Sequence, residues 1–181
     1  MDKIVVLDFG SQYSHLICRR IREFSVYAEL VPFDISYEEL QKHNPKGIIF
    51  SGGPSSVYNL DAPVPVNEIF NMNLPLLGIC YGAEILALTL GGTIRKITSL
   101  QKGIESIQII KENHICKNPI DVFESHGYEI SKLPSVLISI GKSNNCKNEI
   151  IQYGERLIFG TQFHPEMSPD GNDLIEKFCS L

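Results

Sequence analysis

The first half of the chain alternates short apolar runs with longer segments of helical periodicity. The apolar runs predict strands over residues 3–9, 26–33, 46–53 and 75–80. The helical segments cover residues 11–25, 36–44 and 82–92. Ser36, followed three residues later by Glu39, predicts a capping box at the start of the second helix. Because the strands are apolar on both faces and alternate with helices, we expect a parallel sheet covered by helices.

After Gly92 the pattern changes to apolar runs separated by short turns. These runs predict further strands over residues 104–110, 136–143, 149–154 and 157–163. We expect them to add antiparallel strands to the same sheet, before a last helix at about residues 171–180. No repeat or linker interrupts the pattern. The sequence therefore predicts one α/β domain over residues 1–181, with a mostly parallel central sheet flanked by helices and antiparallel additions in the C-terminal half.

Composition narrows the functional classes. The chain has 181 residues, of which 43% are hydrophobic, so one domain with a sizeable core is expected. A net charge of −5 without a basic stripe argues against nucleic acid as a partner. No apolar run approaches the ~20 residues that span a membrane, and the first residues read directly as a strand, so we expect a cytoplasmic protein. The five cysteines show no CxxC spacing, which argues against a zinc site or a disulfide framework.

Cys80 lies where a predicted strand meets a predicted helix. The pattern Gly78-x-Cys80-x-Gly82 resembles a nucleophile elbow, in which small neighbours permit a strained turn that exposes the reactive atom. The amides and the positive dipole end of the following helix favour the thiolate form of a cysteine at this place. The alternative is a buried structural cysteine before a tight turn.

A nucleophilic cysteine needs a base and a group that orients the base. His164 follows an apolar strand and precedes Pro165 and Glu166. In extended chain, positions i and i+2 point to the same side, so we expect Glu166 to hold the imidazole as the acid of a triad does. The alternative is a His-Pro turn with a solvated glutamate. His126, in the loop-like stretch "ESHGYE", is a second candidate base.

A third segment, "SGGPSS" at residues 51–56, follows another predicted strand. Two glycines there let backbone amides point outward, as an oxyanion site requires; a phosphate cradle or a plain turn are the alternatives. Ligands of parallel sheets bind beyond the carboxyl ends of the strands. We therefore expect "DFGSQ" (residues 8–12), "SGGPSS" and Cys80 to meet at one edge of the sheet.

These segments together resemble the class I (triad-type) glutamine amidotransferases. The resemblance covers nearly the whole chain and rests on Gly78-x-Cys80-x-Gly82, His164-Pro165-Glu166 and Ser51-Gly52-Gly53-Pro54. Residues 6–23 and 47–58 are similar to one branch of that family, the glutaminase half of GMP synthetase. The resemblance implies that Cys80 is the nucleophile, His164 the general acid and base, and Glu166 its orienting carboxylate. It also implies an oxyanion hole made by the amides of Gly53 and Tyr81.

The expected contacts with glutamine come from Gly52, Glu84 and the stretch Ser125-His126-Gly127. Two positions depart from the family pattern. Glutamine is usual where this chain has Glu84, and aspartate is common where it has Tyr128. A carboxylate at position 84 raises the pKa of the thiol unless it is paired, or it holds the ammonium group of the substrate.

The resemblance implies hydrolysis of glutamine to glutamate and ammonia through a cysteine thioester, with no metal and no organic cofactor in this chain. In GMP synthetases the glutaminase is often fused to an ATP-pyrophosphatase domain, and this sequence stops at Leu181. We therefore expect a heteromeric complex with a partner subunit that binds ATP and Mg and converts XMP to GMP.

Three other interpretations remain open. The ammonia could serve another acceptor, such as chorismate in anthranilate-type synthases. A different class of cysteine hydrolase also places an elbow cysteine in an α/β sheet, although the pair His164-x-Glu166 disfavours it. A regulatory binding subunit could keep the fold without turnover, and Glu84 is the residue that leaves this interpretation open.

Overall fold

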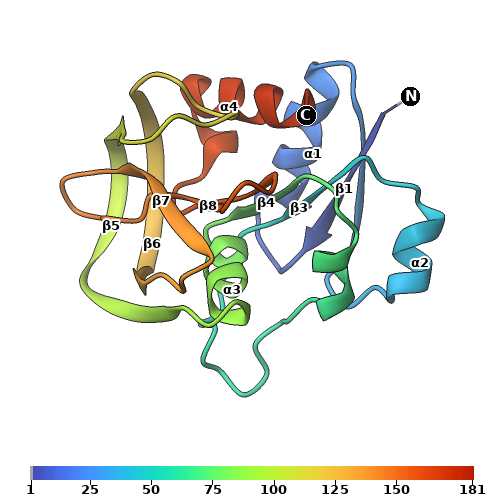
Figure 1. Ribbon diagram of the computed structural model, residues 1–181, viewed down its shortest axis with the longest axis horizontal. Helices are drawn as coiled ribbons and strands as arrows, with labels where there is room; N and C mark the ends of the chain where they lie inside the picture. Colours follow the sequence, from blue (N-terminus) through green and yellow to red (C-terminus); the bar gives the residue numbers. More distant parts are fainter. Residues whose placement is uncertain (1) are drawn as a thin grey trace.

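A single mixed sheet of nine strands organises the protein. The structure is a computed structural model that describes residues 2–181. The strands follow the order β2-β1-β3-β4-β9-β8-β7-β5-β6 (Figure 1). The α/β class predicted from the sequence is confirmed: the sheet has a parallel part, formed mainly by the N-terminal half of the chain, and an antiparallel part formed by the C-terminal half.

The parallel part contains four strands from the first 80 residues and one late strand. Its members are β1 (Lys3–Asp8), β2 (Tyr27–Pro32), β3 (Gly47–Phe50), β4 (Leu76–Ile79) and β9 (Ile158–Thr161). β9 pairs with β4 in parallel and with β8 in antiparallel orientation. The prediction that the late strands add only antiparallel pairs is therefore wrong for β9, which joins the two parts of the sheet.

The antiparallel part ends in a long two-stranded ribbon. The strands of the antiparallel part are β5 (Thr93–Ile109), β6 (Ile120–Lys132), β7 (Leu137–Lys142) and β8 (Ile150–Tyr153). The ribbon consists of β5 and β6. β5 pairs with β6 over most of its length but with β7 only at Gln108 and Ile109. The sequence placed His126 in a loop, and this expectation is wrong because residues 120–132 form strand β6.

Helices cover both faces of the sheet. They are α1 (Ser14–Glu23), α2 (Tyr37–Lys42), α3 (Tyr81–Thr89) and α4 (Pro169–Cys179), with short 3-10 helices η1 (Asn67–Asn71) and η2 (Pro165–Met167). Figure 1 shows α1 and α4 next to each other, with α3 on the other side of the sheet. Ser36 caps α2 by accepting a hydrogen bond from the Glu39 amide at 3.2 Å, as predicted.

Alternate residues of β1 enter two separate cores. Val5 and Leu7 pack with α3, whereas Ile4 and Val6 pack with α1 and α4. This double burial explains why the strand is apolar throughout and does not alternate with polar residues. Among residues 2–181, no helix has the length and apolar character needed to cross a membrane.

Candidate active site

Cys80 occupies a strained turn between β4 and α3. Its φ is +50°, a conformation that non-glycine residues seldom adopt. The two flanking glycines are required by close contacts: a Cβ on Gly82 would lie 2.6 Å from the Phe50 carbonyl oxygen, and one on Gly78 would lie 2.5 Å from the Gly82 carbonyl oxygen. The Cys80 amide donates to the Thr161 carbonyl of β9 at 2.7 Å. The expected elbow is therefore present, and β9 fixes it.

His164 and Glu166 form a buried pair just after β9. The imidazole Nδ1 lies 2.9 Å from Glu166 Oε1, and Glu166 is fully buried. The reason for the pairing differs from the expected one, because only His164 is extended while Glu166 lies in the 3-10 turn η2. Two further contacts fix this segment: the His164 amide donates to the Phe123 carbonyl of β6, and Arg20 Nε donates to the Glu166 carbonyl.

The nucleophile and the candidate base line the same cavity. This cavity, of about 400 Å³, is lined by Gly10, Ser11, Gln12, Tyr13, Gly53, Pro54, Cys80, Ser125 and His164. A Cβ placed on Gly52 would lie 3.1 Å from Cε1 of His164 and 3.8 Å from Cβ of Cys80, so both side chains border one backbone position. The three segments expected at one edge of the sheet therefore meet there.

The amides expected to form an oxyanion hole lie beside Cys80. Tyr81 is the first residue of α3, and its backbone amide lowers the pKa of the Cys80 thiol. Gly53 follows β3 and lines the cavity with Cys80. A Cβ on Gly53 would lie 2.6 Å from the Phe9 carbonyl oxygen, which explains why no side chain stands there.

A second, smaller cavity also borders Cys80 and shares Gly53, Pro54 and Ser125 with the first. It has a volume of about 220 Å³, and its lining includes Glu84, Ser125, His126, Gly127 and Tyr128. Apart from Gly52, the residues expected to contact glutamine therefore line one space next to the thiol.

The imidazole of His126 borders this space, but both of its ring nitrogens contact groups of the protein interior. Its Nδ1 lies 2.7 Å from the Tyr128 carbonyl oxygen, and its Nε2 lies 2.8 Å from Glu124 Oε2. Burial opposes protonation of this ring, but Glu124 and the Tyr128 carbonyl outweigh it and raise the pKa of His126. The side chain is therefore committed to internal contacts, and the interpretation of His126 as a second candidate base loses its support.

The sequence predicted two opposing effects on the pKa of Cys80, and the one that raises the pKa prevails. Burial and the nearby Glu84 carboxylate raise the pKa of the Cys80 thiol well above its ordinary value, although the Tyr81 amide lowers it. The helix N-terminus thus has the expected sign of effect but is outweighed. In this conformation the neutral thiol is the favoured form, so a base must take its proton during attack.

Glu84 is itself buried, in the first turn of α3. Burial raises the pKa of its carboxyl to about 7, opposed by a hydrogen bond from Gln162 Nε2 at 3.4 Å and by the charge of His126. Glu84 is therefore poised between its neutral and charged forms near neutral pH.

Two residues that the sequence analysis did not select support the site. The ring of Tyr13 packs edge-on against the imidazole of His164, with ring centroids 5.7 Å apart. Gln162 accepts a hydrogen bond from the Ile130 amide at 2.7 Å and donates to Glu84. Tyr13 follows the "DFGSQ" segment directly, which is the only sequence signal for its position.

Comparisons with known proteins agree with this geometry. Residues 5–180 match the family described as glutamine amidotransferase class-I. The chain is 43% identical to GMP synthase [glutamine-hydrolyzing] of Lactobacillus johnsonii and 45% identical to that of Helicobacter acinonychis, each time over 98% of the chain and 36% of the relative. It thus spans about a third of the length of these curated relatives.

Solved structures extend the comparison. A protein from Thermoplasma acidophilum, described as one subunit of a GMP synthase, superposes with a TM-score of 0.84 at 30% identity, covering 99% of this chain and 93% of the other. A glutamine amidotransferase from Thermotoga maritima has a TM-score of 0.73 at 20% identity, over 94% of this chain and 78% of the other, and supports the fold alone.

Proposed function

Because this chain belongs to the class-I glutamine amidotransferases, we propose that it hydrolyses glutamine at Cys80 and supplies the ammonia for the amination of XMP to GMP. The observation that carries the proposal is the cavity that joins the strained Cys80 to the buried pair of His164 and Glu166. The choice of XMP as the acceptor of the ammonia rests on the relatives that align with 98% of this chain, which are GMP synthases.

The first chemical step is attack on the side-chain amide of glutamine. Nδ1 of His164 donates a hydrogen bond to Glu166, which leaves Nε2 free to accept the thiol proton of Cys80. The sulfur then bonds to the amide carbon, and the carbonyl oxygen becomes an oxyanion. The amides of Gly53 and Tyr81 stabilise this oxygen, and each such donor contributes about 3–4 kcal/mol in enzymes where it has been removed.

The second half of the reaction releases both products. His164 gives its proton to the departing nitrogen, the carbon–nitrogen bond breaks, and ammonia leaves a γ-glutamyl thioester on Cys80. His164 then takes a proton from water, whose oxygen attacks the thioester carbon. Glutamate leaves, and the proton returns to the sulfur. The sum is glutamine and water converted to glutamate and ammonia, with one group acting as base and acid in turn.

We propose that the acceptor unit is a separate ATP-pyrophosphatase subunit that binds ATP, Mg and XMP. Support comes from the Thermoplasma protein, a chain of nearly the same extent that is described as one subunit of a GMP synthase. The acidic composition and the absence of a membrane-crossing helix among the described residues agree with a cytoplasmic heteromeric complex.

The direct test of the nucleophile is covalent trapping. A glutamine-analogue electrophile such as diazo-oxo-norleucine should add to Cys80, as detected by mass spectrometry of the digested protein. Cys80→Ala should abolish both the adduct and glutaminase activity while the circular dichroism spectrum stays unchanged. Buried Cys146 offers a matched control, because Cys146→Ala should keep both adduct and activity. Glutamine hydrolysis at the parent rate by Cys80→Ala would reject the proposal.

The acceptor is tested separately. Purified chain should show weak glutaminase activity, and it should be stimulated by a GMP synthetase ATP-pyrophosphatase subunit loaded with ATP and XMP. In the control assay, an anthranilate-type synthase subunit with chorismate takes the place of the ATP-pyrophosphatase subunit with ATP and XMP. This pair should not stimulate the glutaminase activity. Equal turnover with and without the loaded subunit would remove the GMP assignment and leave the glutaminase chemistry intact.

A further inference from the structure

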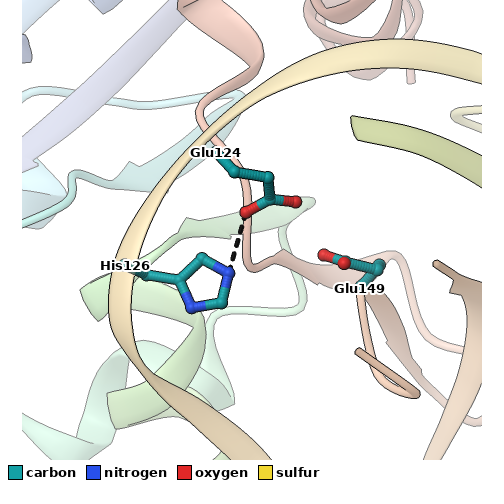
Figure 2. A group of neighbouring side chains, drawn as sticks. All are labelled: Glu124, His126 and Glu149. Atoms are coloured by element: carbon teal, nitrogen blue, oxygen red, sulfur yellow. Dashed lines mark ion pairs between the residues drawn. The ribbon is translucent and has the colours of Figure 1, made fainter. Parts of the chain in front are cut away.

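A cluster of three buried side chains lies outside the catalytic triad, in the antiparallel part of the sheet. Glu124 and His126 stand two residues apart on β6, and Glu149 directly precedes β8. One donor atom of each lies within 4.8 Å of the others. The three residues are only 3%, 4% and 1% exposed. Figure 2 shows the two carboxylates facing each other with the imidazole beside them.

The polar atoms that point into this cluster lack hydrogen-bond partners. Among residues 2–181, no group hydrogen-bonds to either oxygen of Glu124, to Oε2 of Glu149 or to Nε2 of His126. The contact of His126 Nε2 with Glu124 Oε2 is short, at 2.8 Å, but its geometry is not that of a hydrogen bond. The pairing of Glu124 with His126 and the Ser143 hydrogen bond to Glu149 thus leave both carboxyl groups with oxygens that accept no hydrogen bond, and a cation between the two groups would satisfy these oxygens.

The surrounding contacts orient these atoms as in metal sites. A carbonyl oxygen only accepts, so the 2.7 Å contact with the Tyr128 carbonyl places the proton on Nδ1 of His126 and turns the other ring nitrogen toward the carboxylates. A metal-binding histidine characteristically donates its second ring nitrogen to such an acceptor. Ser143 donates to Glu149 Oε1 at 2.6 Å and thereby fixes the second carboxylate.

From this geometry we propose that Glu124, His126 and Glu149 bind a divalent cation of the zinc class. One imidazole nitrogen and two carboxylate oxygens form a mixed donor set that suits Zn²⁺, whereas Mg²⁺ and Ca²⁺ prefer oxygen ligands alone. The cation can arrive through the smaller cavity, because His126 lines it together with Cys80. Burial and the charge of Glu124 raise the pKa of Glu149 to about 9, so a bound cation neutralises Glu124, displaces the proton of Glu149, and links β6 to the segment that leads into β8.

The sequence alone did not reveal this site. Glu149 lies far from the other two ligands in the chain, so the spacing shows no metal-binding motif, and the expectation that this chain holds no metal rested on such motifs. The fold brings the ligands together because β6 and β8 belong to the same antiparallel part of the sheet.

The test measures zinc binding in the full chain carrying Cys80→Ala. This background matters because Cys80, His164 and Glu166 could themselves bind zinc. After treatment with a chelator, titration calorimetry with ZnCl₂ should show one equivalent bound per chain. The melting temperature should rise with Zn²⁺ and stay constant with Mg²⁺. No zinc binding in this protein, or binding only when Cys80 is present, would overturn the proposal.

Isosteric variants then locate the site. In the same background, Glu124→Gln and Glu149→Gln should each weaken zinc binding by at least about tenfold, since each removes a charged ligand. Glu129→Gln is the matched control: Glu129 is a buried carboxylate on the same strand that pairs with Arg95 outside the cluster, and the variant should bind zinc like its parent. Equal affinity of all three variants would also overturn the assignment. If one variant folds poorly, the other still locates the site, and an absence of zinc binding in the Cys80→Ala protein overturns the proposal without either variant.

Discussion

At the scale of single residues, the site is defined by a buried carboxylate beside a buried thiol. Glu84 lies in the first turn of the helix that begins at Tyr81, and its charge is one cause of the raised pKa of Cys80. Glutamine is usual at this position in the family that the sequence resembles. The chain therefore has an ionisable carboxyl with a pKa of about 7 where the family pattern places an amide of nearly the same shape.

Glu84→Gln should make Cys80 more reactive. Removing the carboxylate lowers the pKa of the thiol, so more thiolate is present near neutral pH, and alkylation by iodoacetamide should accelerate by roughly three- to tenfold at pH 8. The rate is followed by mass spectrometry of the peptide that contains Cys80. The variant Glu68→Gln, on η1, serves as the charge-matched control and should react like the parent. An unchanged or slower rate for Glu84→Gln would show that the carboxylate does not act on the sulfur.

The two members of the histidine pair should differ in the size of their effects. His164→Ala removes the base itself and should reduce kcat for glutamine hydrolysis by about 10²- to 10⁴-fold. Glu166→Ala removes only the group that holds the ring, at 2.9 Å from Nδ1, so its loss should be smaller and should leave KM nearly unchanged. Steady-state glutaminase assays measure both constants. A larger loss for Glu166→Ala than for His164→Ala would mean that the roles are assigned wrongly.

How far the site could be predicted depended on whether its residues lie in one short motif. Cys80 and the pair of His164 and Glu166 each carry a local signal, namely flanking glycines and a spacing of two. Glu124 and Glu149 carry none, because they become neighbours only through strand pairing. For the pKa of Cys80, the sequence predicted the effect of Glu84 but not that of burial, which is the larger cause.

At the scale of elements, the elbow depends on how closely α3 approaches β3. Gly82 in the first turn of α3 lies against the carbonyl oxygens of Phe50 and Ser51, at the end of β3 where the "SGGPSS" segment begins. The absence of a side chain at this point lets the helix start directly over the strand ends. The position of the thiol and the position of the glycine-rich segment are thus set by the same contact.

Gly82→Ala should therefore destabilise the fold and displace the oxyanion segment. Its Cβ would lie 2.6 Å from the Phe50 carbonyl oxygen, which is backbone and can yield only if α3 or β3 moves. Overpacking of this kind costs about 1–3 kcal/mol. Urea unfolding measures the loss. Gly127→Ala is the control for stability, since its Cβ would only touch the end of Leu100 at 3.9 Å. Equal stability of both variants would show that α3 and β3 can accommodate a methyl group at Gly82.

Element prediction succeeded for apolar strands and failed where a strand buries charge. The alternate inward positions of β6 are Val122, Glu124 and His126. Two of these three are polar, so the alternation of apolar and polar residues that signals a strand is absent, and the segment was interpreted as a loop. The parallel pairing of β9 also escaped prediction, because pairing direction is decided by the path of the chain and not by the local sequence of the strand.

At the scale of the whole molecule, two cores on opposite faces of the sheet supply most of the buried apolar surface. Buried carboxyl groups lower the free energy of unfolding when they ionise at high pH. Glu84 is the example whose titration falls near neutrality. In the folded state its pKa is about 7, against an ordinary value of 4.5. Because the folded pKa is the higher one, the associated stabilisation is complete below pH 4.5 and is lost as the pH rises through 7.

The free energy of unfolding should consequently fall less steeply with pH in Glu84→Gln than in the parent. The amide does not ionise, so between pH 4.5 and 8 the stability of the variant relative to the parent should improve by up to about 3 kcal/mol. Denaturant titrations at pH 5 and pH 8 on both proteins give the difference. Parallel pH profiles would show that Glu84 does not titrate in this interval.

The central position of β9 in the sheet has a consequence for when the active site forms during folding. This strand comes long after Cys80 in the chain, yet its Thr161 carbonyl accepts the Cys80 amide hydrogen bond, and His164 follows its end. A polypeptide that lacks β9 and the residues after it has the thiol of Cys80. It does not have His164, the proposed base that takes the proton of this thiol. In the proposed mechanism, glutamine hydrolysis therefore requires that β9 be inserted between β4 and β8, and a chain without β9 should not hydrolyse glutamine.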